Sequence, residues 1–169
     1  MKITIEEQNR LEALYQSFLK DEKILRMKDI SMHRGSNCYI HCFKVAKKAI
    51  KKSLRRKDIN LEVVLLGAIL HDYYLYDWRK DRSLLKKHGK NHPNVAINNA
   101  VKDFDISDDV KKVIKSHMWP LNIKEYPKSK EAKIVSISDK AVTIKESLTT
   151  KKHKKKNVDK YLAYISHLF

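Results

Sequence analysis

The dipeptide His71-Asp72 stands directly after the apolar segment 61–70. An ionisable pair beside such a segment costs free energy unless it is compensated, because a buried charge must be paired or must bind a metal. Four further residues of ligand type lie at wide intervals along the chain: His41, His92, His117 and Asp139. Neutral imidazole and carboxylate suit iron, manganese, nickel and zinc. The sequence therefore predicts a metal site if the fold gathers these side chains around the pair.

Each of these residues also has an ordinary structural interpretation. His41 on a buried stripe can be a hydrogen-bonded core histidine, and Asp139 on a helix can face solvent. His71 at the end of a helix is favoured by the helix dipole, with Asp72 as a nearby capping carboxylate. His92 precedes a proline, and such histidines are often surface residues. Only convergence of several of these residues separates a metal site from these alternatives.

Helical periodicity runs through every readable segment, so the sequence predicts an all-α fold. Three glycines and three prolines in the whole chain argue against a turn-rich β architecture. The predicted helices cover residues 5–25, 37–54, 61–73, 93–103, 108–119, 131–148 and 158–169, with a loop over 74–93. Asn60 and Ser107 are predicted N-caps, and Pro93 is expected in the first turn of its helix. We expect six or seven helices packed around one centre.

Two of these helices present candidate ligands on predicted buried faces. In the segment 37–54, His41 shares a stripe with Cys38 and Val45, and lysines occupy the opposite face. In the segment 131–148, the apolar residues in register are Ile134, Ile137, Ala141, Ile144 and Leu148. Asp139 lies near the middle of this helix among apolar residues, which predicts that it points inward.

Length and composition are typical of one soluble globular domain spanning residues 1–169, with 42% hydrophobic and 34% charged residues. The N-terminus has acidic residues where a signal peptide needs an apolar stretch. The longest apolar run, 63–70, is far shorter than the roughly 20 residues that span a membrane. Cys38 and Cys42 stand one helical turn apart and are expected to be reduced packing residues. These features predict a cytoplasmic protein.

The net charge is +17, and lysines and arginines concentrate at 44–57 and 151–156. Such positive fields attract nucleotides, polyanions or anionic surfaces. No aromatic residues alternate with these charges, as a nucleic-acid platform would require. We therefore favour a solvated helix face and a solubilising loop, while nucleic-acid binding stays open.

Three segments together resemble the HD-domain superfamily of metal-dependent phosphohydrolases. Residues 39–46 look like the family's first helix, where a histidine precedes a Val-Ala pair by four residues. Residues 67–72 look like its apolar helix ending in His-Asp, and 137–140 like its late-helix aspartate. The likeness covers roughly residues 33–150. It implies an all-α HD fold.

The resemblance also implies a ligand set, because some members carry two further histidines between the His-Asp pair and the last aspartate and bind two metals. Four residues would then hold one ion: His41, His71, Asp72 and Asp139. His92 and His117 would hold the other, and Asp72 would bridge the two and orient a metal-bound hydroxide. His88 competes for the role of His92, which we favour. The implied cofactor is one or two divalent ions of iron, manganese, nickel or zinc.

By the same resemblance, the leading function is hydrolysis of a small anionic phosphate ester or nucleotide, as a phosphomonoesterase or phosphodiesterase. Residues placed near a substrate are His33, Arg34, Arg79 and Lys140. Lys140 adjoins Asp139 but points about 100° away from it on a helix.

Two other functions stay open. A two-metal centre of histidines and aspartates also resembles that of HD-type mixed-valent di-iron oxygenases. Alternatively, the chain is a basic nucleotide- or RNA-binding module that keeps a metal as a structural element.

Overall fold

The computed structural model describes residues 3–32, 36–77, 82–148 and 154–169, without the side chains of residues 82–88, 90 and 154–158. Its regular elements are helices, which confirms the predicted all-α class. They are α1 (Ile5–Lys20), α2 (Glu22–Leu25), the 3-10 helix η1 (Arg26–Asp29), α3 (Cys38–Ser53), α4 (Leu61–Leu70), α5 (Arg82–Asp103), α6 (Asp108–Ser116), α7 (Lys130–Leu148) and α8 (Lys154–Ile165). The sequence predicts one helix over residues 5–25, whereas the structure divides this segment at Asp21, which ends α1 and caps α2.

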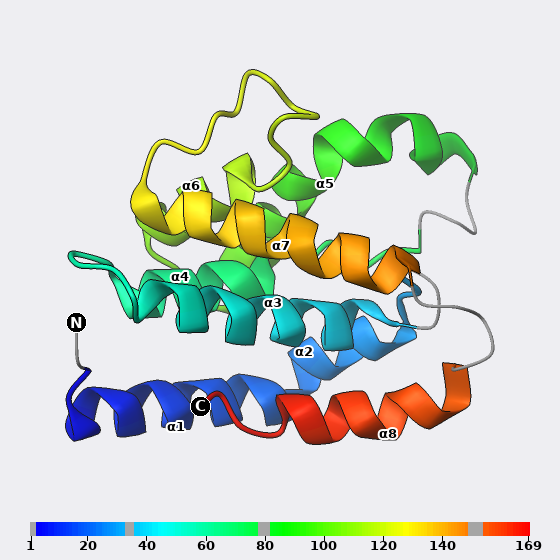
Figure 1. The fold of residues 1–169 in the computed structure, drawn as a ribbon. Helices are drawn as coiled ribbons and strands as arrows, with labels where there is room; N and C mark the ends of the chain where they lie inside the picture. Colours follow the sequence, from blue (N-terminus) through cyan, green and yellow to red (C-terminus); the bar gives the residue numbers. More distant parts are fainter. Residues whose placement is uncertain (1–2, 33–35, 78–81, 149–153) are drawn as a thin grey trace.

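The helices pack around α3 and α4 at the centre (Figure 1). Helix α7 packs on both of them from one side, and α1 and α8 lie on the other side. Helix α6 packs against α4 and α7. The end of α8 is fastened to α1 by hydrogen bonds from the Tyr15 hydroxyl to the Ile165 carbonyl (2.7 Å) and from Gln16 to the Ser166 carbonyl (2.6 Å).

Helix α4 is the most deeply buried element. Every residue of it except Glu62 is buried, and a helix that is apolar on all sides needs neighbours on all sides. Asn60 caps it as predicted, since its side chain accepts a hydrogen bond from the Val63 amide (3.2 Å). The helix ends at Leu70, earlier than the predicted Tyr73, so His71 and Asp72 leave it at its carboxyl end.

The predicted buried face of α7 is wrong in part. Ile137, Ile144 and Leu148 are 52%, 61% and 76% exposed, although they are in register with Ile134. The face that packs inward instead includes Ser138, Val142 and Glu146. Apolar periodicity misleads here because Ser136 and Glu146 of α7 find hydrogen-bond partners inside the protein and therefore compete for the buried face.

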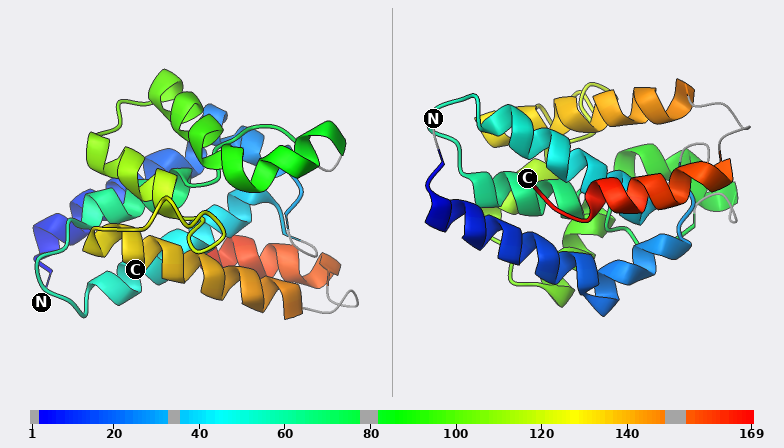
Figure 2. Two further views of the ribbon diagram at one scale, coloured as in Figure 1. Left: turned by 90° about the horizontal axis from the view of Figure 1, so that it is seen from above. Right: turned by 60° about the horizontal axis from the view of Figure 1, so that its bottom comes forward.

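Helix α5 begins at Arg82, whereas the sequence predicts a loop up to Pro93. Pro93 lies inside the helix and removes one backbone hydrogen bond, which commonly causes a kink. Figure 2 shows α5 as a bent ribbon. Val101, predicted to point inward, is 50% exposed.

Cys38 and Cys42 are free and buried, as predicted. Among the described helices, none combines the length and the apolar character that crossing a bilayer requires.

Candidate metal centre

The His-Asp pair is held rigidly where α4 ends. His71 is the C-cap residue, and its Nδ1 donates to the Ala68 carbonyl three residues earlier (2.8 Å). The Asp72 carbonyl accepts hydrogen bonds from the Cys38 thiol (3.2 Å) and the Tyr74 amide (2.8 Å). His71 and Asp72 are both buried. Local backbone geometry therefore turns the His71 ring so that its Nε2 points away from the helix.

His117 repeats this arrangement on α6. It is the C-cap residue of that helix, and its Nδ1 donates to the Ile114 carbonyl three residues earlier (2.6 Å). The two helices approach closely, because a Cβ added to Gly67 would lie 2.5 Å from Val113 Cγ1. The ring centroids of His71 and His117 are 4.9 Å apart. The absence of a side chain at Gly67 thus allows the carboxyl ends of α4 and α6 to lie close together, which places His71 beside His117.

His41 reaches the same point from α3 and is fixed by α7. Its Nδ1 lies 2.9 Å from Glu146 Oε2, and its Nε2 lies 3.1 Å from Asp139 Oδ1. The other oxygen of Glu146 accepts a hydrogen bond from the Lys44 ammonium (2.9 Å). Thr143 donates to Asp139 Oδ1 (3.2 Å). The packing of α3 on α7 therefore decides how His41 and Asp139 face each other.

His92 completes the cluster from α5. It is buried, and its Nε2 lies 2.9 Å from His117 Nε2 and 3.2 Å from Asp72 Oδ1. Its ring also contacts Tyr74, with centroids 5.7 Å apart. His92 is thus an interior residue, which excludes the surface interpretation. The side chain of its competitor His88 lies outside the described side chains.

The Asp72 carboxylate stands between two sets of imidazoles. Its Oδ2 lies 3.4 Å from His71 Nε2. Its Oδ1 lies 3.2 Å from His92 Nε2 and 3.5 Å from His117 Nε2. Asp139 Oδ1 lies 3.7 Å from His71 Nε2 on the other side of the cluster. All six predicted ligand residues therefore converge, with Asp72 beside the three histidines His71, His92 and His117, and with His71 also beside His41 and Asp139.

The donor atoms of this cluster fit a divalent transition metal. Three histidines commit Nδ1 to an acceptor, which leaves each Nε2 lone pair directed inward at carboxylate oxygens or other rings. The Nε2 of His71 is buried without a hydrogen-bond partner. Facing lone pairs repel unless a cation or a proton lies between them. Ligands that share an ion at about 2.1 Å lie roughly 3.0–3.4 Å apart, close to the separations seen here.

Two overlapping groups have the spacing of metal ligands. One contains His41, His71 and Asp139, and the other contains His71, Asp72 and His117. Imidazole and carboxylate without thiolate are the donors that suit manganese, iron, nickel and zinc. The buried groups can thus hold a metal, and nothing in the donor set selects one of these elements.

Electrostatics follow from this packing. Burial lowers the pKa of His41, but hydrogen bonds and charge from Asp139 and Glu146 outweigh burial and raise that pKa well above its ordinary value. The pKa of His71 is also raised well above its ordinary value, because Asp72 and Cys42 outweigh burial. Burial opposes ionisation of Glu146, yet His41 and Lys44 lower its pKa to about 2. The metal-free cluster therefore binds protons that a metal must displace.

The pKa values of the two aspartates are lowered, in contrast to those of His41 and His71. Burial raises the pKa of Asp72, but His71, His117 and His92 outweigh it and hold that pKa well below its ordinary value. Asp139 likewise has a lowered pKa, because His41 and His71 outweigh burial. Both carboxylates are ionised and ready to bind a cation at neutral pH.

Of the predicted substrate-binding residues, Lys140 lies in the described part of the chain. Its ammonium donates to the His117 carbonyl (2.9 Å) and to the Ser136 hydroxyl (2.8 Å). The bond to the His117 carbonyl ties α7 to the end of α6, so Lys140 supports the position of His117. Contact with a substrate stays a prediction for it. His33, Arg34 and Arg79 lie outside the described residues.

Sequence reasoning missed Glu146, which orients His41. Glu146 follows Asp139 by seven residues, two helical turns, and so lies on the same face of α7. That seven-residue spacing was the feature of the sequence from which Glu146 could have been placed beside Asp139. The apolar register predicted for α7 concealed it, because it placed the buried face elsewhere.

A helical fold around a buried cluster of histidines and aspartates defines a class of metal-binding α-helical proteins. The family model that matches the chain is the HD domain, over residues 38–143. This range covers more than half of the chain and contains the six clustered residues. The chain belongs to the HD domain family, which is part of the superfamily of metal-dependent phosphohydrolases and whose members bind divalent metals. Comparison with curated proteins and with solved structures yields no match.

Proposed function

We propose that this protein hydrolyses a small anionic phosphate ester or nucleotide, using two divalent ions in the histidine–aspartate cluster. The observation that carries the proposal is the position of Asp72. One of its oxygens faces His71 and the other faces His92 and His117. A carboxylate placed in this way is suited to bridge two ions.

Divalent ions in such a site polarise phosphate oxygens and activate water at neutral pH. The chain's own contribution is to hold the ligands and the reacting groups in place. Asp72 stays ionised and lies where it can orient the attacking water. Glu146 and two backbone carbonyls fix the tautomers of His41, His71 and His117. The positive charge of the chain favours approach of an anionic substrate.

The direct test is metal analysis of the purified protein, followed by assays on aryl phosphate monoesters and diesters with added Mn²⁺ or Zn²⁺. We expect the unaltered protein to hydrolyse these esters, chelation to abolish the activity and added metal to restore it. We expect Asp72→Ala to be inactive. A matched control is Lys111→Ala, which changes a charge on the surface of α6. A folded, metal-loaded protein that hydrolyses neither these esters nor nucleotides would refute the proposal.

The second candidate is an HD-type di-iron oxygenase. It is favoured by the same donor set, four histidines and two aspartates around a central carboxylate, which also suits a pair of iron ions. Aerobic purification followed by iron analysis and electron paramagnetic resonance distinguishes the two functions. A mixed-valent di-iron signal would support the oxygenase. Activity with Mn²⁺ on aryl phosphates in iron-free protein would support the hydrolase.

A further inference from the structure

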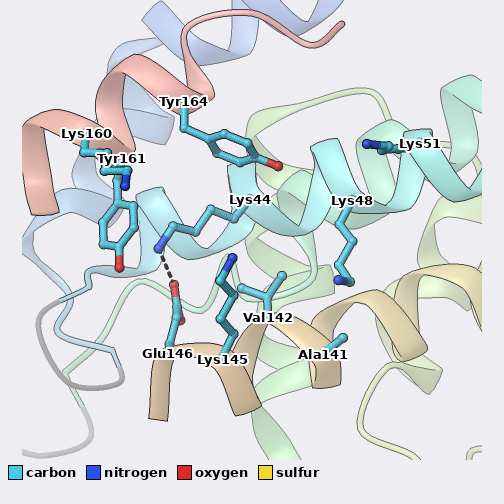
Figure 3. Close-up of a pocket in the computed structure, with 10 residues that line it drawn as sticks. All are labelled: Lys44, Lys48, Lys51, Ala141, Val142, Lys145, Glu146, Lys160, Tyr161 and Tyr164. Atoms are coloured by element: carbon cyan, nitrogen blue, oxygen red, sulfur yellow. Dashed lines mark hydrogen bonds and ion pairs between the residues drawn. The ribbon is translucent and has the colours of Figure 1, made fainter. Parts of the chain in front are cut away.

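A cavity lies beside the metal centre, between α3, α7 and α8 (Figure 3). Its volume is about 340 Å³, within the range of pockets that hold small molecules. The Lys44–Glu146 pair forms part of its wall and separates it from His41. The cavity is thus a distinct space, and the hydrolytic reaction proposed above makes no use of it.

Lysines from three helices surround this cavity. Helix α3 contributes Lys44, Lys48 and Lys51, α7 contributes Lys145, and α8 contributes Lys160. Figure 3 shows the ammonium groups of Lys48 and Lys145 in the space between α3 and α7. The α3 lysines follow one another at four and three residues, so they share a helix face and span about 10 Å along it. The positive charge is therefore spread along the cavity and is not confined to one end.

The negative charge that lines the cavity is already paired with other residues of the protein. Glu146 is the only carboxylate among the residues that line it in the described structure, and its oxygens bind His41 and Lys44. Within the described residues, Lys48, Lys51 and Lys160 form no ion pair. An excess of positive charge thus remains around the cavity.

Two tyrosines hold α8 in position and form a wall of the cavity. The Lys44 ammonium lies 3.2 Å from the centroid of the Tyr161 ring, and the Lys47 ammonium lies 4.9 Å from that of Tyr164. Both contacts are cation–π interactions between α3 and α8. The ring of Tyr164 lines the cavity and offers a flat apolar surface beside the lysines.

We propose that this cavity binds the polyphosphate group of a small molecule, separately from the metal centre. A single phosphate would engage one end of a row of ammonium groups that spans about 10 Å, whereas a chain of phosphates engages several at once. The limited volume between three helices suits a small molecule better than a nucleic-acid strand. The proposal therefore assigns a role to part of the lysine cluster at 44–57, for which a solvated face was favoured.

The test is calorimetric titration of the purified protein with inorganic tripolyphosphate near physiological salt. Lys48→Ala/Lys51→Ala removes two charges that do not contact the metal ligands. We expect it to weaken binding about tenfold. The matched control is Lys111→Ala/Lys112→Ala, which removes the same charge from α6, where these lysines pair with Asp108 and Asp109 (2.8 Å each). We expect less than about a twofold effect from it, and unchanged metal content in both variants.

Three results would overturn the proposal. The first is no detectable binding of tripolyphosphate to the unaltered protein. The second is equal weakening by the two lysine pairs, which would indicate attraction by net charge alone. The third is loss of binding in Asp72→Ala with retention in Lys48→Ala/Lys51→Ala, which would place the phosphates at the metal centre.

A further arm distinguishes a free polyphosphate from a nucleotide. ATP and tripolyphosphate that bind equally well indicate that the phosphate chain alone is recognised. Tighter binding of ATP, with the advantage lost in Tyr164→Ala, indicates that a base stacks on this ring. Either result supports a polyphosphate site. Binding of single-stranded RNA without binding of tripolyphosphate contradicts it.

Discussion

At the residue scale, the orientation of three of the four imidazoles is decided by what Nδ1 binds. Backbone carbonyls of Ala68 and Ile114 fix His71 and His117, and a carboxylate, Glu146, fixes His41. Partners of this kind set the tautomer and raise the basicity of a metal ligand. The cluster is therefore suited to bind cations, because several of its members are hydrogen-bond acceptors that face one another.

The position of Asp72 leads to a prediction about metal stoichiometry. Asp72→Ala removes the carboxylate that faces both sets of imidazoles, so we expect it to lose both ions. His117→Ala removes a ligand from one set, so we expect it to lose one ion. Plasma mass spectrometry on the purified variants, with circular dichroism to check folding, measures this. Folded Asp72→Ala protein with full metal content would show that the ligand assignment is wrong.

Glu146 is expected to act through His41. Glu146→Gln keeps an acceptor for the His41 Nδ1–H but removes the negative charge, so we expect metal affinity to fall about tenfold. Glu146→Ala removes the acceptor as well and should weaken binding further, towards about a hundredfold. Competition with a fluorescent chelator measures these affinities.

The control for Glu146 is Glu6→Gln, an exposed position on α1. It should bind metal like the unaltered protein. Equal metal affinity of Glu146→Ala and Glu6→Gln would contradict a positioning role for Glu146.

At the element scale, the cluster depends on how closely α4 and α6 approach. Gly67 permits this approach because a Cβ there would meet the Val113 side chain at 2.5 Å, a contact that requires a shift. The same two helices end in His71 and His117. The distance between the helices therefore sets the distance between two imidazoles.

Gly67→Ala is expected to separate these helices. Overpacking of this kind costs about 1–3 kcal/mol of unfolding free energy, although alanine favours the helix locally. We expect a lower midpoint of thermal denaturation together with weaker binding of the ion nearest His117. Urea denaturation and metal analysis measure the two effects.

The double variant Gly67→Ala/Val113→Ala tests the cause. Removing the Val113 methyl groups relieves the clash, so the loss from Gly67→Ala should be smaller in that background by about 1 kcal/mol. A loss of unfolding free energy in the double variant equal to the sum of the losses in the two single variants would contradict the proposed contact.

At the scale of the whole molecule, charge couples the stability of the protein to pH. The pKa values of His41 and His71 are raised in the folded metal-free protein. Their protonation therefore stabilises this state fully below about pH 6.5, the value of an unfolded histidine, and the contribution is lost as pH rises through the raised pKa. Metal displaces these protons, so its binding strengthens as pH rises.

We accordingly expect metal to raise the midpoint of thermal denaturation more at about pH 8 than at about pH 6. The measurement compares protein with excess Mn²⁺ and protein after chelation at each pH. In Asp72→Ala the metal effect should vanish at both pH values. A larger metal effect at the lower pH would contradict this linkage.

Much of the fold was predictable because it is encoded locally. Asn60 and Ser107 cap the helices that they were predicted to cap, since an N-cap satisfies amides only two or three residues away. The start of α5 and the inward face of α7 were not predictable in this way. The inward face of α7 depends on partners distant in sequence, His41 and Lys44 for Glu146, which override the isoleucine register.

The sequence by itself determined the kinds of ligand and the helices that carry them, because side-chain chemistry, periodicity and capping are properties of short segments. Only the tertiary structure decided that the six residues converge, that Asp72 stands between two sets of imidazoles, and that Glu146 orients His41. These facts follow from helices packed across long separations in the chain. Such packing is governed by the shape and burial of the whole core, with Gly67 as the point where the absence of one side chain brings two histidines together.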